Sequence, residues 1–173
     1  QTPVTASDLQ GTPAAQVAND AGDFAWFGQR FSAVFYRGAG TPQAIRVLQL
    51  GDEVAGLAGS RVLNVFTPLL MNSSGLIAFR ADVLTTTRIT NAIFTFDGTT
   101  LQVIATGADT APGTGGKKFE RAMTLFDLNS NGDLLFGSTL IPNGSSVAAE
   151  PTVFLKPAGG AISRIAGPGT AAP

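Results

Sequence analysis

The sequence predicts an all-β protein made of three propeller-like repeats, each with about four short antiparallel strands. Three observations support this prediction: a motif that recurs three times, period-2 alternation of apolar residues after each copy, and turn-forming residues between the apolar runs. The copies begin near Asn19, Asn72 and Asn129, which gives repeat lengths of 53 and 57 residues. Four strands in this length suit a propeller blade or a similar four-stranded sheet.

Each copy starts with Asn-x-x-Gly and continues as an alternating apolar run. Asn at the first and Gly at the fourth position are typical of a type I turn. The alternation that follows places two large side chains on one face, as in a half-buried strand. Trp26 stands where the other copies have Phe, so it is expected in the core. The paired residues are Phe24 and Trp26, Ile77 and Phe79, and Leu134 and Phe136.

Two further strands are expected in each unit, and a fourth segment in the first two units. A second apolar strand is followed by a turn, for which Asp97-Gly98 is the strongest hairpin signal. A third strand and a fourth segment then lead to the next Asn. Residues 119–125 could be read as a short helix, but they align with a strand-like segment of the preceding unit. The second strands are expected at 33–35, 92–94 and 152–154, the third at 45–50, 101–105 and 162–166, and the fourth at 62–70 and 119–126.

The last unit lacks a fourth segment, whereas about eighteen residues precede Asn19. We therefore expect one repeat to be split between the two ends of the chain, with residues 1–18 as an N-terminal arm and 19–173 as the β-repeat domain. The arm could close a three-unit ring, although propellers usually have 4–8 blades. It could instead complete the open unit of a neighbour by β-strand addition, or three molecules or fewer could close a larger ring. A terminus without a partner is the remaining alternative.

Strand addition between copies predicts where subunits would meet. The arm holds three scattered large apolar residues, so it cannot form its own core. A head-to-tail contact whose rotation does not close gives an open filament. The expected interface residues are Thr2, Pro3, Val4, Thr5, Ala6, Leu9, Ile162, Arg164 and Ile165.

Composition favours self-association and excludes several other partners. Charged residues make up 13% of the chain, against about 25% in a typical soluble domain, so little charge repulsion separates the copies. With a net charge of −1 and no basic run, nucleic acid is not expected as a partner. No apolar stretch approaches the roughly 18 residues of a membrane helix. The first residue is Gln and no signal-peptide pattern follows, as in a processed secreted protein or a trimmed chain.

No catalytic chemistry is predicted. The chain has no Cys and no His, which excludes disulfides, thiol catalysis and a Ser-His-Asp triad. Asp52 and Glu53 are adjacent, and adjacent strand residues point to opposite faces, so they form a poor acid–base pair. The run 113–118 lacks the first Gly and the final Ser or Thr of a phosphate-binding loop. We expect neither enzymatic activity nor a cofactor.

Two kinds of bound group leave weaker signals. Residues 127–132 match the first half of a calcium loop. At the twelfth position, however, where such a loop needs a bidentate Glu, the chain has Ser138, so no metal site is expected. Tyr36 is the candidate ligand contact of a binding module. Two Asn-x-Ser patterns and two Ser/Thr clusters are candidate glycosylation sites. The weak calcium candidates are Asp127, Asn129, Asn131 and Asp133, and the glycosylation candidates are Asn72, Asn143, Thr85, Thr86, Thr87 and Ser145.

The three Asn-x-x-Gly-x-x-x-Phe/Trp copies, together with the run 108–113, resemble bacterial secreted proteins with tandem NxxGxxAF repeats and a choice of C-terminal anchor. The match is best at 72–83 and 107–116. The resemblance implies a propeller-like β fold, an extracellular or cell-surface location and no established enzymatic activity. Members typically have more repeats and often an anchor, whereas this chain has three units and no anchor pattern.

Together these observations predict a secreted structural protein that assembles head to tail into an extracellular filament. The split repeat, the small number of units and the missing catalytic chemistry favour it. The alternative is a monomeric extracellular binding module, with glycans among its candidate ligands.

Overall fold

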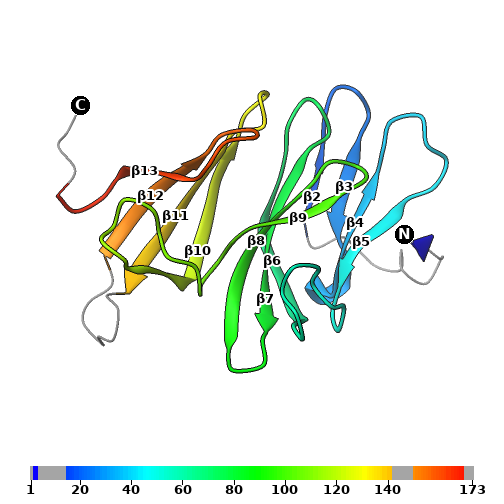
Figure 1. Ribbon diagram of the computed structural model, residues 1–173. Coiled ribbons are helices and arrows are strands. Elements are labelled where there is room, and N and C mark those ends of the chain that lie inside the picture. The colour runs from blue at the N-terminus through cyan, green and yellow to red at the C-terminus, as the bar shows by residue number, and fades with distance from the viewer. Residues whose placement is uncertain (1, 4–14, 142–149, 170–173) are drawn as a thin grey trace.

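The computed structural model describes residues 2–3, 15–141 and 150–169, which form three antiparallel sheets in succession along the chain (Figure 1). This arrangement confirms the predicted all-β, propeller-like fold class. The first sheet contains β1 (Thr2–Pro3), β2 (Gln16–Ala18), β3 (Phe24–Phe27), β4 (Ala33–Arg37) and β5 (Ile45–Gln49), with a 3-10 turn, η2 (Gln29–Phe31). The second contains β6 (Arg61–Met71), β7 (Ile77–Leu84), β8 (Ile89–Phe96) and β9 (Leu101–Thr106). The third contains β10 (Lys118–Leu128), β11 (Leu134–Ile141), β12 (Glu150–Lys156) and β13 (Ser163–Ala166).

The Asn-x-x-Gly motif forms the predicted turn in all three sheets. The Gly N–H donates to the Asn carbonyl at 3.1 Å in the first two copies and at 3.0 Å in the third. The three glycines, Gly22, Gly75 and Gly132, have φ between 81° and 91°, a region that side chains with a Cβ rarely adopt. Each turn joins two adjacent antiparallel strands, namely β2 to β3, β6 to β7 and β10 to β11.

The sheets group the strands differently from the predicted units. Because the Asn turn is a tight hairpin, the strand before it and the strand after it pair in the same sheet. The chain instead crosses between sheets through residues 50–60 and 107–117. Each sheet thus starts one strand earlier than the predicted unit, and the third sheet has four strands from one continuous stretch, β10 to β13. The expected division of one repeat between the chain ends is therefore corrected.

The described parts of the predicted arm pair within their own chain. Strand β2 occupies the first position of the first sheet, as β6 and β10 do in theirs. Strand β1 adds a fifth strand beside β5. The first sheet consequently has the order β1-β5-β4-β3-β2, while the second and third keep the simple order of their four strands.

A pair of aromatic side chains occupies the same cross-strand position in each sheet. The rings are stacked, with centroids 5.4, 5.4 and 5.5 Å apart, and each pair joins the second and third strands of the four-strand unit. The pairs are Trp26 with Phe35, Phe79 with Phe94, and Phe136 with Phe154. Trp26 is 7% exposed, which confirms that it belongs to a core.

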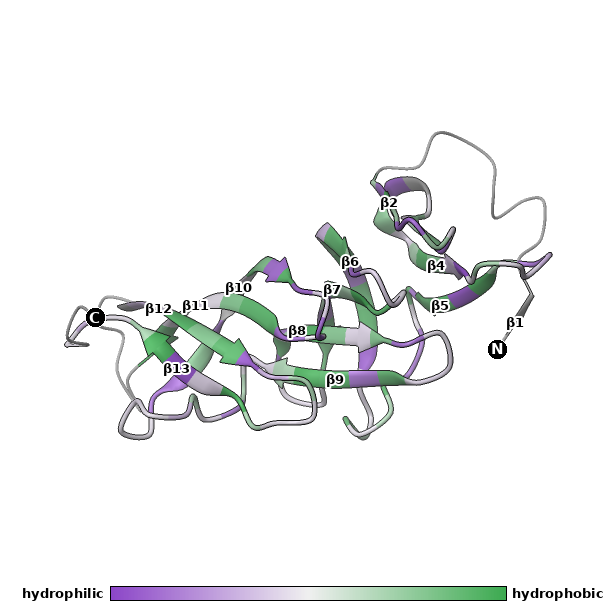
Figure 2. Cartoon of the chain, turned by 90° about the horizontal axis from the view of Figure 1, so that it is seen from above, coloured by the Kyte–Doolittle hydropathy of each residue, from purple (hydrophilic) through white to green (hydrophobic). Residues whose placement is uncertain are grey.

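Two hydrophobic cores hold the three sheets together. One core lies between the first and second sheets and includes Phe27, Tyr36 and Phe79. The other lies between the second and third and includes Ile93, Phe136 and Phe154. Figure 2 shows apolar residues along the strands of all three sheets. The aromatic pairs of the second and third sheets thus face the preceding sheet.

No helix among the residues that the structure describes has both the length and the hydropathy that a membrane crossing requires.

Candidate assembly surfaces

The three Asn turns are linked by side-chain hydrogen bonds that run from sheet to sheet. The side-chain amide of Asn19 donates to the carbonyl of Asn72 at 3.2 Å, and that of Asn72 donates to the carbonyl of Asn129 at 3.0 Å. We call this series the asparagine ladder. Since every donor lies in one sheet and its acceptor in the next, the ladder has a direction. The sequence predicted the turns but not the ladder, because its bonds depend on how closely the sheets stack.

The Asn turn of the second sheet packs closely against the Asn turn of the first. We call the turn that supplies the close-packed glycine the inserting turn, and the turn against which it packs the receiving turn. The carboxylate of Asp23 accepts hydrogen bonds from the Ala39 N–H at 2.7 Å, the Asn19 amide at 2.7 Å and the Tyr36 hydroxyl at 3.2 Å. Gly75 of the second sheet lies against this group, because a Cβ there would stand 2.6 Å from the Asp23 carboxylate and 2.8 Å from the Tyr36 oxygen. The contact therefore requires glycine for space as well as for backbone conformation.

This group also perturbs two ionisable side chains. The Ala39 N–H, followed by the Asn19 amide, lowers the pKa of Asp23 below its usual value. Burial, followed by the charge of Asp23, raises the pKa of Tyr36 to about 12. Tyr36 is 7% exposed and packs edge-to-face on Phe96 of the second sheet. The expectation that Tyr36 contacts a ligand is therefore corrected, because its ring is part of the contact between sheets.

The third sheet repeats the receiving turn of the first. Asp133 accepts hydrogen bonds from the Ala158 N–H and from the Asn129 amide, both at 2.9 Å, as Asp23 does from Ala39 and Asn19. The Ala158 N–H, followed by the Asn129 amide, lowers the pKa of Asp133. Among the described residues, nothing lies over Asp133 as Gly75 lies over Asp23, and Asn129 is exposed. The third sheet thus presents a receiving turn without its counterpart.

The outer face of the third sheet is apolar and partly exposed. In the first two sheets, the residues at three equivalent positions are 0–9% exposed because the following sheet covers them. In the third sheet these positions hold half-buried aliphatic side chains that belong to neither core. Phe126 and Ile165 add exposed fractions of 50% and 44%. The equivalent sets are Ala25, Val34 and Tyr36, then Ala78, Ile93 and Thr95, and finally Leu135, Val153 and Leu155.

The outer face of the first sheet carries its aromatic pair. Trp26 and Phe35 form a small third cluster with Ala33, against which Phe24 and Ala44 pack. No other sheet of the described chain lies on this face, although the equivalent rings of the other two sheets pack on the sheet that precedes them. Trp26 and Phe35 are nevertheless only 7% and 3% exposed.

The predicted strand-addition edge exists at the same place in two sheets. Within the chain, Thr2 pairs with Arg46 and Pro3 with Ile45 on the edge of β5. By register with the aromatic pair, Arg164 on β13 occupies the position of Arg46 on β5.

Among the described residues, β13 pairs with β12 only. A hollow next to β13 is lined by Ile162, Ser163, Arg164, Pro112 and Gly113. Two of the expected interface residues, Ile162 and Arg164, therefore border this hollow, and Ile165 lies exposed beside them. Val4, Thr5, Ala6 and Leu9 lie outside the described residues.

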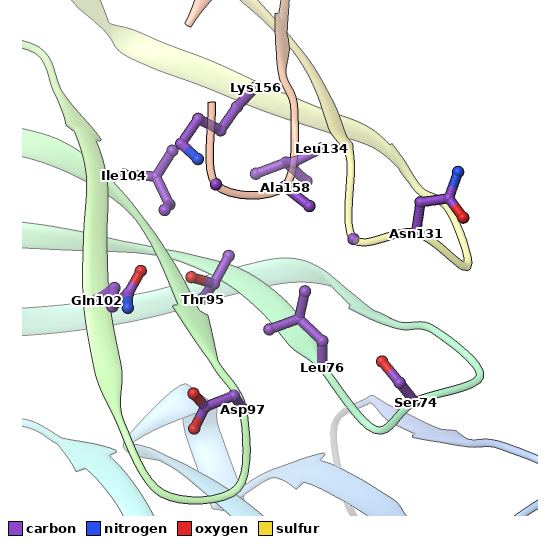
Figure 3. A pocket seen from close by; sticks show the side chains of 12 residues that line it. Ser74, Leu76, Thr95, Asp97, Gln102, Ile104, Asn131, Leu134, Lys156 and Ala158 are labelled. Carbon is purple, nitrogen blue, oxygen red and sulfur yellow. The ribbon is translucent and has the colours of Figure 1, made fainter. Parts of the chain in front are cut away.

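A polar groove of about 280 Å³ lies between the turns of the second and third sheets (Figure 3). Its polar lining includes Thr95, Asp97, Gln102 and Lys156. Between the first and second sheets, the ring of Tyr36 takes the place that the smaller Thr95 leaves open here. The groove is thus a consequence of one difference between otherwise equivalent sheets.

Side-chain oxygens of the weak calcium candidates Asp127, Asn129 and Asp133 accept hydrogen bonds in and beside the turn that begins at Asn129. Both carboxylate oxygens of Asp133 accept hydrogen bonds, and Asn129 Oδ1 accepts from the N–H groups of Asn131 and Asp133. The carboxylate of Asp127 accepts from the N–H of the next residue, Leu128. Within the described parts of the chain, no three acidic, Cys or His side chains lie close enough together to hold a metal ion.

The glycosylation candidates differ in accessibility. Asn72 is 5% exposed, and its amide nitrogen, to which an N-glycan would be attached, donates to Asn129. This candidate is therefore corrected, because the folded turn leaves that nitrogen no room. Thr85 bonds to Arg88 within the β7–β8 hairpin, whereas Thr86 and Thr87 are exposed there. Asn143 and Ser145 lie outside the described residues.

Comparison with known proteins identifies a family but no characterised relative. Neither a curated protein nor a solved structure matches the chain. One family model covers residues 2–173, which is nearly the whole sequence and includes all three sheets. The chain therefore belongs to the family of unknown function DUF7453.

Proposed function

We propose that this chain is the subunit of an extracellular structural homopolymer whose copies join head to tail. In this proposal, strand β1 of one copy leaves the edge of its own β5 and adds to the edge of β13 in a neighbour. The observation that carries the proposal is the equivalence of the two edges: Arg164 stands on β13 where Arg46 stands on β5, and Arg46 is the pairing partner of Thr2.

The exchange replaces one backbone pairing by a similar one. Strand β1 spans two residues, so little pairing is lost when it leaves β5. Transfer to β13 forms the same kind of antiparallel edge, which is the low-cost route by which domain swapping joins identical chains. The small fraction of charged residues, 13%, and the net charge of −1 keep repulsion between copies low.

The extracellular location belongs to the same proposal. The location is supported by the resemblance to secreted NxxGxxAF-repeat proteins. The structural role is supported by a sequence without Cys or His, which offers no catalytic nucleophile–base pair of the common kinds. Glycans attached to the exposed Thr86 and Thr87 would be compatible with this location.

Electron microscopy of the purified chain, with and without residues 1–9, tests the proposal. We expect the whole chain to form filaments and the deletion variant to stay unassembled while its circular dichroism remains that of a β protein. A synthetic peptide of residues 1–18, added in excess, should shorten the filaments by occupying β13 edges, and a scrambled peptide should not. Filaments of normal length from the deletion variant would exclude strand addition.

A monomeric binding module is the second candidate, and the polar groove between the second and third sheets favours it. Asp97, Gln102 and Lys156 could together hydrogen-bond the hydroxyl groups of a sugar. A monodisperse monomer in native mass spectrometry that binds glycans, and loses this binding on Gln102→Ala, would support this candidate over the polymer.

A further inference from the structure

The first and third sheets, at the two ends of the stack, each carry one half of the contact that joins neighbouring sheets. These two halves are complementary, and neither is used within the described chain. At the third sheet, the asparagine ladder ends in a donor: the Asn129 amide bonds to Asp133 within its turn, and the described residues offer it no carbonyl of a following sheet. At the first sheet, the ladder starts with an acceptor: the Asn19 carbonyl accepts only from Gly22 among them, whereas those of Asn72 and Asn129 also accept from the preceding Asn.

The glycines of the turns show the same open end. Gly75 lies against Asp23 and Tyr36 of the preceding sheet, and Gly132 lies against Leu76 of the preceding sheet. Gly22 has the same left-handed conformation, with φ of 91°, yet a Cβ there would meet only Ala39 of its own sheet at 3.9 Å within the described chain. The first sheet thus carries the inserting turn without a receiving turn before it.

We propose that a second copy of this chain stacks its first sheet on the outer face of the third sheet, so that sheet packing continues from copy to copy. This inference rests on the proposed head-to-tail assembly and names the surfaces that meet. The Asn129 amide donates to the Asn19 carbonyl of the second copy, and Gly22 of the second copy sits over Asp133 and Leu155. Both contacts repeat, one sheet further on, those that already join the first and second sheets.

The apolar faces agree with this arrangement. The half-buried Leu135, Val153 and Leu155 occupy positions that the next sheet covers in the other two sheets. Trp26 and Phe35 of the second copy supply the aromatic pair that packs on the preceding sheet in both established interfaces. Because these two rings are already only 7% and 3% exposed, docking buries little more of them, and the newly buried surface lies mainly on the third sheet.

A two-fold contact between two third sheets is the main competing arrangement. It would cover the same aliphatic side chains but leave the donor of Asn129 and the acceptor of Asn19 both unused. The ladder and the glycine turns therefore favour the head-to-tail order, which is a heterologous contact that can repeat without limit.

Disulfide trapping in this cysteine-free chain tests the arrangement directly. Asp20→Cys and Ser130→Cys are placed in separate copies, since both positions are exposed and follow the ladder asparagines of the first and third sheets. Ser73→Cys with Ser130→Cys in one chain is the matched positive control, because it joins the equivalent turns of the second and third sheets. We expect the mixed copies to cross-link in filaments as efficiently as the control does within one chain.

Gly22→Ala tests the turn contact, with Gly116→Ala as the matched control. Both glycines have φ of 91°, and Gly116 has nothing within 4 Å of its added Cβ. Gly22→Ala should raise the concentration at which filaments form by about tenfold or more, the loss expected for one good polar contact, while Gly116→Ala should not.

The outcomes separate the two levels of the proposal. If the unmodified chain forms no filament, head-to-tail assembly itself is wrong. If filaments form but the mixed copies do not cross-link and Gly22→Ala assembles like Gly116→Ala, the stacking is wrong while assembly stands. Cross-linking of Ser130→Cys with itself would point to the two-fold contact and overturn the proposal.

Discussion

Replacing Gly75 by Ala should destabilise the single chain far more than the same change at the equivalent Gly22. Both residues occupy the fourth position of an Asn-x-x-Gly turn, and both have positive φ, 81° and 91°. The strain of a Cβ in this conformation, about 1–2 kcal/mol, is therefore common to both variants. The difference between them isolates what the turn contacts.

The additional cost at Gly75 comes from the first sheet. The new Cβ would stand 2.6 Å from the Asp23 carboxylate and 2.8 Å from the Tyr36 oxygen, so that group must move apart. Losing a hydrogen bond to a charged group costs roughly 1.5–3 kcal/mol. We therefore expect Gly75→Ala to reduce the free energy of unfolding by about 2.5–5 kcal/mol and Gly22→Ala by about 1–2 kcal/mol.

Urea unfolding at a concentration too low for assembly measures both variants. Trp26, the single tryptophan, supplies the fluorescence signal. Gly132→Ala provides an internal scale, because its Cβ would meet the end of the Leu76 side chain at 3.3 Å and should give an intermediate loss. Equal losses for Gly75→Ala and Gly22→Ala, within about 0.5 kcal/mol, would refute the claim that the turns of neighbouring sheets interlock.

Three further measurements probe other contacts. Because the pKa of Asp23 is lowered on folding, its carboxylate stabilises the fold above its unfolded pKa of about 4, and this stabilisation is lost as the pH falls through the folded value. The free energy of unfolding of Asp23→Asn should therefore change less between about pH 5 and 2 than that of the unmodified chain. Because the pKa of Tyr36 is raised to about 12, its neutral hydroxyl stabilises the fold fully below about pH 10, and this stabilisation is lost as the pH rises toward 12. If Tyr36→Phe loses as much free energy of unfolding over this pH range as the unmodified chain does, this assignment is contradicted. Phe136→Ala, in the core and stacked on Phe154, should cost about 3–5 kcal/mol in urea unfolding, whereas Phe126→Ala, at a 50% exposed position, should cost less than about 1 kcal/mol.

The strands could be predicted from the sequence because local rules determine them. Alternation after each Asn-x-x-Gly places the large side chains of β3, β7 and β11 on one face, and Asp97-Gly98 closes the β8–β9 hairpin as expected. Even the stretch 119–125, which could be read as a helix, is strand β10. In each case the signal lies within a few residues, where turn preference and period-2 alternation act together.

The grouping of strands into sheets could not be read from the repeat itself. A repeating sequence looks the same wherever the unit is taken to begin, so the motif gives the period but not the sheet boundary. The available signal was connection length. An Asn turn of four residues can join only adjacent strands, while the longer segments 50–60 and 107–117 can cross to the next sheet. Placing the boundary at Asn129 made a complete third sheet look unfinished.

The candidate surfaces depended on distances that no local pattern encodes. The sequence predicted the turns, and the Oδ1 of each Asn accepts hydrogen bonds within its own turn. The donation by the Asn19 and Asn72 amides to the next turn, however, requires the observed spacing of the sheets. Likewise, Leu135 and Val153 resemble ordinary core residues in the sequence, and only the position of their sheet at the end of the stack leaves them half-buried.

The substitution of Thr95 for Tyr36 at equivalent positions would have a consequence on the scale of the polymer. Each copy carries the polar groove between the turns of its second and third sheets, whereas Tyr36 fills the equivalent place between the turns of its first and second. In a stack of copies these grooves would recur at a fixed interval along the fibre. A ligand presented in several copies on another surface could then engage many weak sites at once, and its overall avidity would exceed the affinity of any single groove.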